Sequence, residues 1–133
     1  MPIAPPLGSL TRLNSNVRDL LSSLFQLSHT ETTVLIMLLK SKKPLTVDQI
    51  AEKTKLDRTT VFRALQKLSR EGREGLCHKE NQPLPGQGYV QVYIPVSKEE
   101  FKLEIEKRIR FVQEGLERLL KKLGDDIDQL LVN

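Results

Sequence analysis

The sequence predicts a mainly α-helical fold that contains one small β-hairpin (α+β). Three observations support this class. Polar residues that can cap a helix precede apolar residues at helical spacing at several points in the first 70 residues. The period then changes to two over Tyr89–Ile94, as in a strand. From Ser97 onward, apolar residues recur three and four positions apart, which predicts a long C-terminal helix.

The composition is that of one ordinary domain, or of a small domain with an appendage. The chain has 133 residues, of which 38% are hydrophobic and 29% are charged, so it can bury a core. Its net charge of +4 fits a nucleic-acid partner but is weak support for one. Cys77 is the single cysteine, which excludes an intramolecular disulfide, and the two histidines have no metal-binding spacing. We expect neither a metal nor another cofactor.

The sequence lacks the features of a membrane-spanning or a secreted protein. No apolar run approaches the roughly 20 residues that span a bilayer. The first residues lack the basic and apolar regions of a secretory signal, so we expect a cytoplasmic protein without membrane contact. Residues 1–10 are rich in proline and are expected to form a flexible arm, with packing across a partner subunit as the alternative.

Two helices are predicted before residue 44. The first begins between Thr11 and Ser15, runs to about Leu27, and has a wide apolar face. Ser28 and Glu31 have the spacing of a capping box, in which each side chain bonds the backbone N–H of the other residue. The helix that follows is apolar on all sides over residues 34–39, so we expect it at the centre of the domain.

A helix-turn-helix is predicted over residues 46–71. Thr46 and Gln49 form a second capping box, and only Lys55 and Leu56 separate this short helix from Asp57, the expected N-cap of helix 57–71. The apolar residues of that helix form one stripe. Outside the stripe lie cationic and hydrogen-bonding residues, none of them acidic: Arg58, Thr59, Arg63, Gln66, Lys67 and Arg70. Such a helix face suits phosphates and base edges of DNA.

A two-stranded wing is predicted after this motif. Residues 70–75 repeat Arg-Glu-Gly, which we interpret as a short insertion. Leu76 to Glu80 is a candidate strand, and residues 81–88 are expected to form a loop because of their proline and glycine content. In the second strand, over residues 89–94, the alternation predicts Val90, Val92 and Ile94 facing the core and Tyr89, Gln91 and Tyr93 facing away.

The C-terminal helix is predicted to start at a third capping box, Ser97 to Glu100, and to run to about Leu123. Its apolar residues form a heptad seam typical of a coiled coil that serves as a dimer interface: Ile105, Ile109, Val112, Leu116, Leu119 and Leu123. Packing within the chain is the alternative. The sequence Gly124-Asp125-Asp126 is expected to interrupt the helix before a last short turn. The predicted organisation is therefore a 1–10 arm, a DNA-binding domain at 11–96 and a dimerisation helix with its tail at 97–133.

Three motifs carry a resemblance to a known family: residues 45–54, residues 56–68 and residues 88–93. Together they resemble winged-helix transcription regulators of the MarR and TrmB type, particularly the small archaeal ones. The resemblance implies a homodimer that binds pseudo-palindromic double-stranded DNA. Lys55 departs from it, because such turns usually have glycine there. If the turn requires a left-handed backbone, a Lys costs on the order of 1 kcal/mol, which a phosphate contact could offset, and a turn of another shape is the alternative. The wing loop also departs, because it has no Arg or Lys between Asn81 and Gly88. We expect no room for the sugar-binding domain of longer relatives.

These considerations assign roles to individual residues. Base contacts are expected from Arg58, Thr59 and Arg63. Phosphate contacts are expected from Thr46, Lys55, Thr60, Lys67, Arg70 and Lys79. Phe62 is either a core residue or an apolar DNA contact. Cys77 is interpreted as a small core hydrophobe, with a redox-sensing thiol as the alternative.

The leading functional hypothesis is a dimeric, sequence-specific DNA-binding transcription regulator, acting as a repressor. One alternative is a non-specific architectural DNA-binding protein of the same fold. Another is a winged helix that binds proteins, which the acid-free face of residues 58–70 disfavours. We do not expect an enzyme, because the sequence has no nucleophile–base pair, metal-ligand spacing or phosphate-binding glycine loop.

Overall fold

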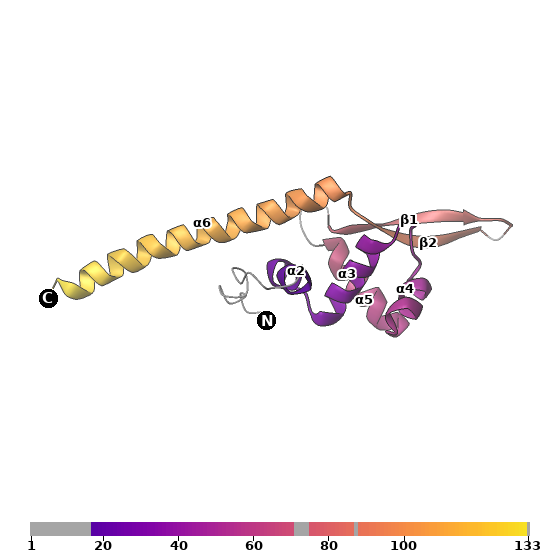
Figure 1. Cartoon of the computed structure of the whole chain (residues 1–133), viewed down its shortest axis with the longest axis horizontal. Helices are drawn as coiled ribbons and strands as arrows, with labels where there is room; N and C mark the ends of the chain where they lie inside the picture. The colour runs from indigo at the N-terminus through magenta and orange to yellow at the C-terminus, as the bar shows by residue number, and fades with distance from the viewer. Residues whose placement is uncertain (1–16, 71–74, 87, 133) are drawn as a thin grey trace.

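The computed structural model describes residues 17–70, 75–86 and 88–132. Over these ranges the chain forms five helices and one hairpin, as the sequence predicts (Figure 1). The elements in order are α2 (Val17–Phe25), α3 (His29–Lys40), α4 (Val47–Thr54), α5 (Arg58–Arg70), β1 (Cys77–Leu84), β2 (Gly88–Pro95) and α6 (Lys98–Leu131).

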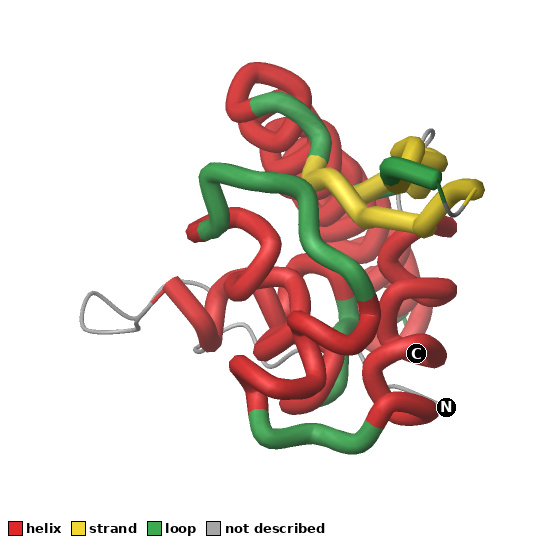
Figure 2. The backbone as a smooth tube through the Cα atoms, turned by 90° about the vertical axis from the view of Figure 1, so that its right-hand side faces the viewer, coloured by secondary structure: helices red, strands yellow, loops and turns green. Residues whose placement is uncertain are grey.

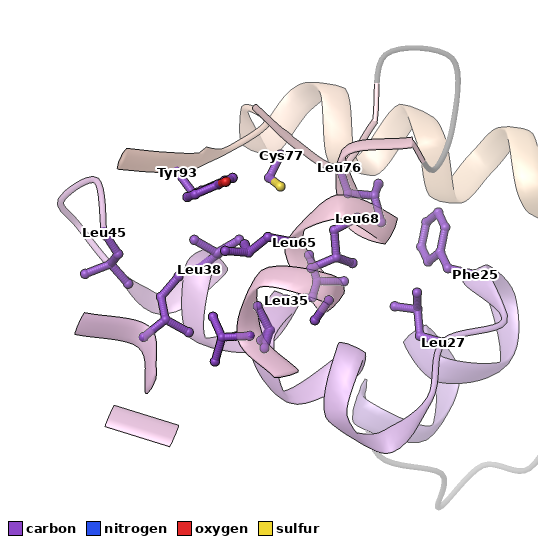
Figure 3. Packing of buried hydrophobic residues seen from close by; sticks show 14 of the residues in the cluster. Phe25, Leu27, Leu35, Leu38, Leu45, Leu65, Leu68, Leu76, Cys77 and Tyr93 are labelled. Carbon is purple, nitrogen blue, oxygen red and sulfur yellow. The ribbon is translucent and has the colours of Figure 1, made fainter. Parts of the chain in front are cut away.

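Helix α3 lies at the centre of the domain. It packs against α2, α4, α5 and the strand β2, and Figure 2 shows the helices gathered together with the hairpin at their edge. The hairpin and α6 extend away from this cluster in opposite directions (Figure 1). Most buried apolar side chains form one cluster, to which α2, α3, α4, α5, β1 and β2 contribute, and the half-buried Phe101 and Ile105 of α6 pack against it. Figure 3 shows its largest members, among them Phe25, Leu35, Leu38, Leu65 and Leu68. A winged helix-turn-helix is therefore assembled on a single core.

The predicted caps of α3 and α4 are confirmed. The backbone N–H of Ser28 donates to Glu31 Oε1 at 2.9 Å, and the N–H of Glu31 donates to Ser28 Oγ at 3.1 Å. Thr46 and Gln49 repeat this arrangement at 2.9 and 3.1 Å. Because two otherwise unpaired N–H groups are satisfied at each helix start, the boundaries agree with the sequence.

The turn of the helix-turn-helix has a left-handed residue at its centre. Lys55 has φ 64° and ψ 24°, so it takes the backbone conformation that favours glycine. The sequence left open whether this turn is left-handed or has another shape, and the structure has the left-handed form. This one residue ends α4, and the half-buried Leu56 then leads the chain directly into α5.

Helix α2 ends two residues earlier than expected. It stops at Phe25 because Gln26 adopts φ 54°, which breaks the helix, and Leu27 then turns inward to 5% exposure. The Leu27 N–H donates to the Ser22 carbonyl at 2.9 Å, and the Ser22 hydroxyl donates to the Leu27 carbonyl at 2.7 Å. The expected start between Thr11 and Ser15 lies outside the described residues.

The hairpin is longer than predicted. Strand β1 covers Cys77–Leu84 and pairs antiparallel with Gly88–Pro95, so residues 81–84 belong to a strand and not to the expected loop. Pro83 pairs opposite Tyr89. A two-stranded sheet has only edge strands, and on an edge a proline that lacks an N–H is tolerated. The repeated Arg-Glu-Gly segment falls largely on residues 71–74, outside the described part.

The predicted direction of Tyr93 is wrong. This side chain is 4% exposed and lies within the core beside Leu45 and Cys77 (Figure 3). Its backbone pairs with that of Leu45, with Tyr93 N–H to Leu45 O at 2.7 Å. The neighbouring Val92 is also buried, at 3% exposure, so both faces of β2 are covered at the base of the hairpin. The alternation of buried and exposed residues along the strand therefore fails there.

The predicted interruption of the C-terminal helix is also wrong. Helix α6 runs without a break through Gly124 to Leu131. A glycine inside a helix costs only about 1 kcal/mol, which the other residues of a 34-residue helix offset. At its start, Ser97 Oγ accepts from the Glu100 N–H at 3.1 Å, as predicted. The Glu100 carboxylate, however, accepts from the Ser97 hydroxyl at 3.1 Å, where a capping box has it accept from the backbone N–H.

Gly75 generates a stability prediction. It has φ +82°, and a Cβ at this position would lie 2.2 Å from the carbonyl oxygen of Ser69. We expect Gly75→Ala to lower the free energy of unfolding by about 2–4 kcal/mol, because backbone must shift. Gly86 has φ +71° with open space around it, so Gly86→Ala should cost only about 1 kcal/mol. Urea denaturation of both variants checks this, and equal losses would contradict the assigned contact.

Candidate nucleic-acid interface

Helix α5 has one buried and one exposed side. Val61, Ala64, Leu65 and Leu68 are at most 2% exposed and lie in the core that α3 and α4 complete. The opposite side carries the exposed residues Arg58, Thr59, Phe62, Arg63 and Gln66. Because the buried stripe fixes the rotation of the helix about its axis, these polar side chains are presented together on the surface. Phe62 is 42% exposed, which places it on this surface and not in the core.

Asp57 caps the N-terminus of α5, as predicted. Its carboxylate accepts from the Thr60 N–H at 3.2 Å and from the Thr60 hydroxyl. These bonds, the hydroxyl first, hold the pKa of Asp57 below its ordinary value. The Thr60 hydroxyl, which the sequence assigned to a phosphate, is thus engaged by the cap.

Arg58 is paired with a residue of the preceding helix. Its Nη1 donates to Asp48 Oδ1 at 2.8 Å, and the two side chains are 66% and 74% exposed. An ion pair this exposed contributes at most about 1 kcal/mol, so a DNA group can displace Asp48. Sequence analysis missed Asp48, because helical spacing does not relate residues on two different helices.

Arg63 differs from Arg58 in its surroundings. Its side chain is exposed in the middle of α5 and has no hydrogen-bond or ion-pair partner among the described residues. Thr59 is exposed one turn earlier on the same side of the helix. The three residues assigned to base contacts therefore lie on one continuous surface.

The expected phosphate contacts are distributed around this surface. Thr46 is half-buried, and its hydroxyl accepts from the Gln49 N–H, so it is engaged as a cap. Lys55 is exposed in the turn. Lys67 lies at the corner between α2 and α3, with its Nζ 3.4 Å from the Gln26 carbonyl and 3.8 Å from Glu31 Oε1. Arg70 is the last residue of α5, and its side chain lies outside the description.

The wing carries little charge toward its tip. Lys79 is exposed on β1 opposite Tyr93, near the base of the hairpin. Beyond it, the described residues of the tip are uncharged from Asn81 to Gly86, and Tyr89 is 73% exposed. Apart from Lys79, the exposed cationic groups near this surface therefore belong to α5 and to the turn before it.

Cys77 has the environment of a core residue. It is 1% exposed, and its Sγ lies 3.5 Å from the Ser69 hydroxyl. Burial raises the pKa of this thiol above its ordinary value, although the Ser69 hydrogen bond opposes the shift. A buried thiol with a raised pKa is a poor nucleophile, which supports the structural interpretation over the redox one.

The residues assigned to the dimer seam divide into two groups along α6. Ile105 is half-buried against the core of its own domain. The others lie beyond that contact: Val112 is half-buried, and Ile109, Leu116, Leu119 and Leu123 are between 39% and 58% exposed. The stripe continues past the predicted end of the helix with Ile127 and Leu130, which are 44% and 77% exposed.

The described residues offer no other chemical site. They contain no group of three or more His, Cys, Asp or Glu side chains placed to hold a metal ion. Of the helices in the described ranges, none combines the length and hydropathy needed to cross a bilayer.

Comparisons with known proteins agree with this geometry. A family described as "Sugar-specific transcriptional regulator TrmB" matches residues 21–99, more than half of the chain. No curated protein gives a significant match. The fold is similar to that of a possible transcriptional regulator from Methanosarcina mazei, with a TM-score of 0.69, 25% identity and coverage of 83% of this chain and 92% of that one.

A second solved structure, of a protein from the thermoacidophilic archaeon Sulfolobus tokodaii, has a TM-score of 0.58 and 21% identity. The match covers 72% of this chain and 90% of the other, and it supports the fold alone. The family match confirms the expectation of a DNA-binding regulator and not an enzyme. From its helix-turn-helix, its wing and this match, the chain belongs to the TrmB family of transcriptional regulators.

Proposed function

We propose that this protein is a homodimeric repressor that binds a specific pseudo-palindromic DNA site and reads its major groove with α5. The observation that carries the proposal is the exposed side of α5, where Arg58, Thr59, Phe62, Arg63 and Gln66 form a surface without a carboxylate of that helix. A helix of this kind fits the major groove, where side chains reach base edges.

Within this surface, Arg63 is the strongest candidate for base recognition. Its guanidinium has no partner in the described part of the chain, whereas that of Arg58 is paired with Asp48. An arginine in the middle of a recognition helix can donate two hydrogen bonds to O6 and N7 of guanine. Thr59, one turn before Arg63, and Phe62, next to it in the helix, supply a hydroxyl and an apolar surface of the kind that contacts a thymine methyl group.

The proposed phosphate contacts surround this centre. Lys55 in the turn and Lys79 on the wing are exposed cations on either side of α5 in the sequence. Lys67 and Arg70 lie toward the end of the helix. Contacts of this kind position a protein on the duplex without reading its sequence. Repression needs no further surface, because a bound dimer excludes other proteins from the same DNA.

The dimer is proposed to form through α6. Its exposed apolar residues from Ile109 to Leu130 have no covering element among the described residues of the chain. A second copy that covers them gives a twofold arrangement of two recognition helices. Such a pair binds two half-sites about 34 Å apart on one side of the duplex, which requires a pseudo-palindromic sequence.

Selection of bound sequences from random DNA tests the proposed specificity. We expect one enriched motif with inverted half-sites, bound at least about 1,000-fold more tightly than random DNA at the same salt concentration. A dimer that binds DNA without enriching a motif would support the architectural alternative. A protein that binds neither kind of DNA would contradict the proposal.

Arg63→Ala should reduce the affinity for the selected site by about 1–3 kcal/mol and should affect random DNA little, because the lost contact is to a base. Lys67→Ala should instead weaken both DNAs similarly and reduce the slope of log affinity against log salt by about one. Lys121→Ala, an exposed position on α6, is the control and should change neither. Fluorescence anisotropy titrations at several salt concentrations measure all three. Equal losses on both DNAs for Arg63→Ala would refute its assigned role.

The double substitution Leu116→Asp with Leu119→Asp should convert the dimer to a monomer. It places charges on the apolar stripe, and we expect the dimer to weaken at least about 100-fold, since each buried leucine contributes roughly 1.5–3 kcal/mol. Lys121→Asp adds an acidic group on the opposite side of the same helix and should leave the dimer intact. Size-exclusion chromatography with light scattering measures the molar mass of both variants. A double variant that remains dimeric would place the interface elsewhere.

A further inference from the structure

The side of α6 that carries the exposed apolar residues is also the side that packs against its own domain. The ring of Phe101 stacks on Phe25, with centroids 5.9 Å apart, and Ile105 packs on the core. The guanidinium of Arg108 lies 5.1 Å from the centre of the Phe25 ring. At 3.6 residues per turn, Phe101 and Ile105 align with Ile109 on a single side.

This side is covered in its first part and bare in its second. From Ile109 onward the apolar side chains are exposed apart from the half-buried Val112, with 43% exposure at Ile109 and 77% at Leu130. Figure 1 shows the second half of α6 extending beyond the rest of the domain. We call the bare part the distal stripe, and its members are Ile109, Val112, Leu116, Leu119, Leu120, Leu123, Ile127, Leu130 and Leu131.

The covered part constrains how a second copy can lie on the distal stripe. Two paired helices have axes about 8–10 Å apart. In a parallel, in-register pair, the first part of the partner's helix would run along the side that bears Phe101 and Ile105. Phe25 and the remainder of the core already occupy that volume. In an antiparallel pair centred near residue 118, the last helical residue of the partner, Leu131, lies opposite position 105, so the partner's helix does not run past Phe101 and the stacked Phe25.

The charges along α6 favour the same orientation. Arg108 and Asp126 are 18 residues apart, which is five full turns, so they lie along the same edge of the stripe. Asp125 and Asp128 flank Asp126, whose Oδ2 lies 3.9 Å from Lys122 Nζ. A parallel pair places the two acidic turns side by side. An antiparallel pair centred near residues 117–118 places each acidic turn opposite the partner's turn of Arg108 and Arg110.

We propose that α6 pairs antiparallel with α6 of a second copy through the distal stripe, so that the two DNA-binding domains lie at opposite ends of the paired helices. This rests on the dimer of the proposed function and adds its orientation. With a midpoint at residue 118, the two Ile105 residues lie about 39 Å apart along the axis. That distance is comparable to the spacing of about 34 Å between successive major grooves.

Disulfide trapping tests the orientation in the full chain. Cys77→Ala removes the native thiol, and Ile109→Cys and Ile127→Cys are then introduced singly and together. An antiparallel pair places position 109 opposite position 127, within the roughly 7 Å between Cα atoms that a disulfide can bridge. Only the double variant should form a covalent dimer on oxidation. The Ile127→Cys single variant is the matched control, because a parallel pair would cross-link it to itself.

A distance measurement makes the test independent of disulfide geometry. Val132 is 80% exposed, and a spin label on Val132→Cys in the same background should give a distance of about 42 Å in an antiparallel pair. A parallel pair would give less than about 25 Å. Three outcomes would overturn the orientation alone: a short distance between the labels, cross-linking of the Ile127→Cys single variant, or a dimer in which the double variant does not cross-link. A monomer in light scattering would overturn both the orientation and the dimer on which it rests, while the DNA selection reports separately on recognition.

Discussion

Burial of one side of α5 is the constraint on which the proposed DNA surface depends. Val61, Leu65 and Leu68 have no exposed surface, and a fully buried side chain of this size stabilises a fold by roughly 1.5–3 kcal/mol. The exposed Arg58–Asp48 pair contributes at most about 1 kcal/mol. Hydrophobic burial therefore sets the rotation and position of α5, and the polar residues between the buried ones face outward as a consequence.

Helix α6 extends the same principle beyond the domain. One side of it is used twice: first for packing on Phe25 and the core, and then, from Ile109 onward, as a bare apolar surface. The intramolecular contact and the proposed subunit contact therefore share one helical stripe. Because the first contact fixes the direction in which α6 leaves the domain, it also limits the ways in which a second copy can approach.

Local signals predicted much of this fold. The caps at Ser28, Thr46 and Asp57 depend on a few consecutive residues, and the structure has each of them. The apolar stripe of α5 was likewise readable from its spacing, and with it the candidate surface around Arg63. These features are predictable because their energetics lie within one or two helical turns.

The errors arose where distant parts of the chain decide the outcome. Tyr93 is buried because Leu45, far away in sequence, pairs with its backbone at the base of the hairpin. Asp48 was missed as the partner of Arg58 because the two residues belong to different helices. The proline and glycine content of residues 81–88 predicts a loop, yet residues 81–84 lie in β1, because an edge strand tolerates Pro83. The predicted interruption of α6 at Gly124 is wrong because one glycine costs too little to break a helix of 34 residues.

The most direct test of the central claim, that the exposed side of α5 reads bases in the major groove, is methylation interference on the selected site. Methylation of guanine N7 blocks the major-groove edge, and methylation of adenine N3 blocks the minor groove. The account predicts that N7 methylation at one or more guanines in each half-site prevents binding, and that Arg63→Ala removes this sensitivity. Binding that is insensitive to N7 methylation, or sensitive only to adenine N3 methylation, would contradict it.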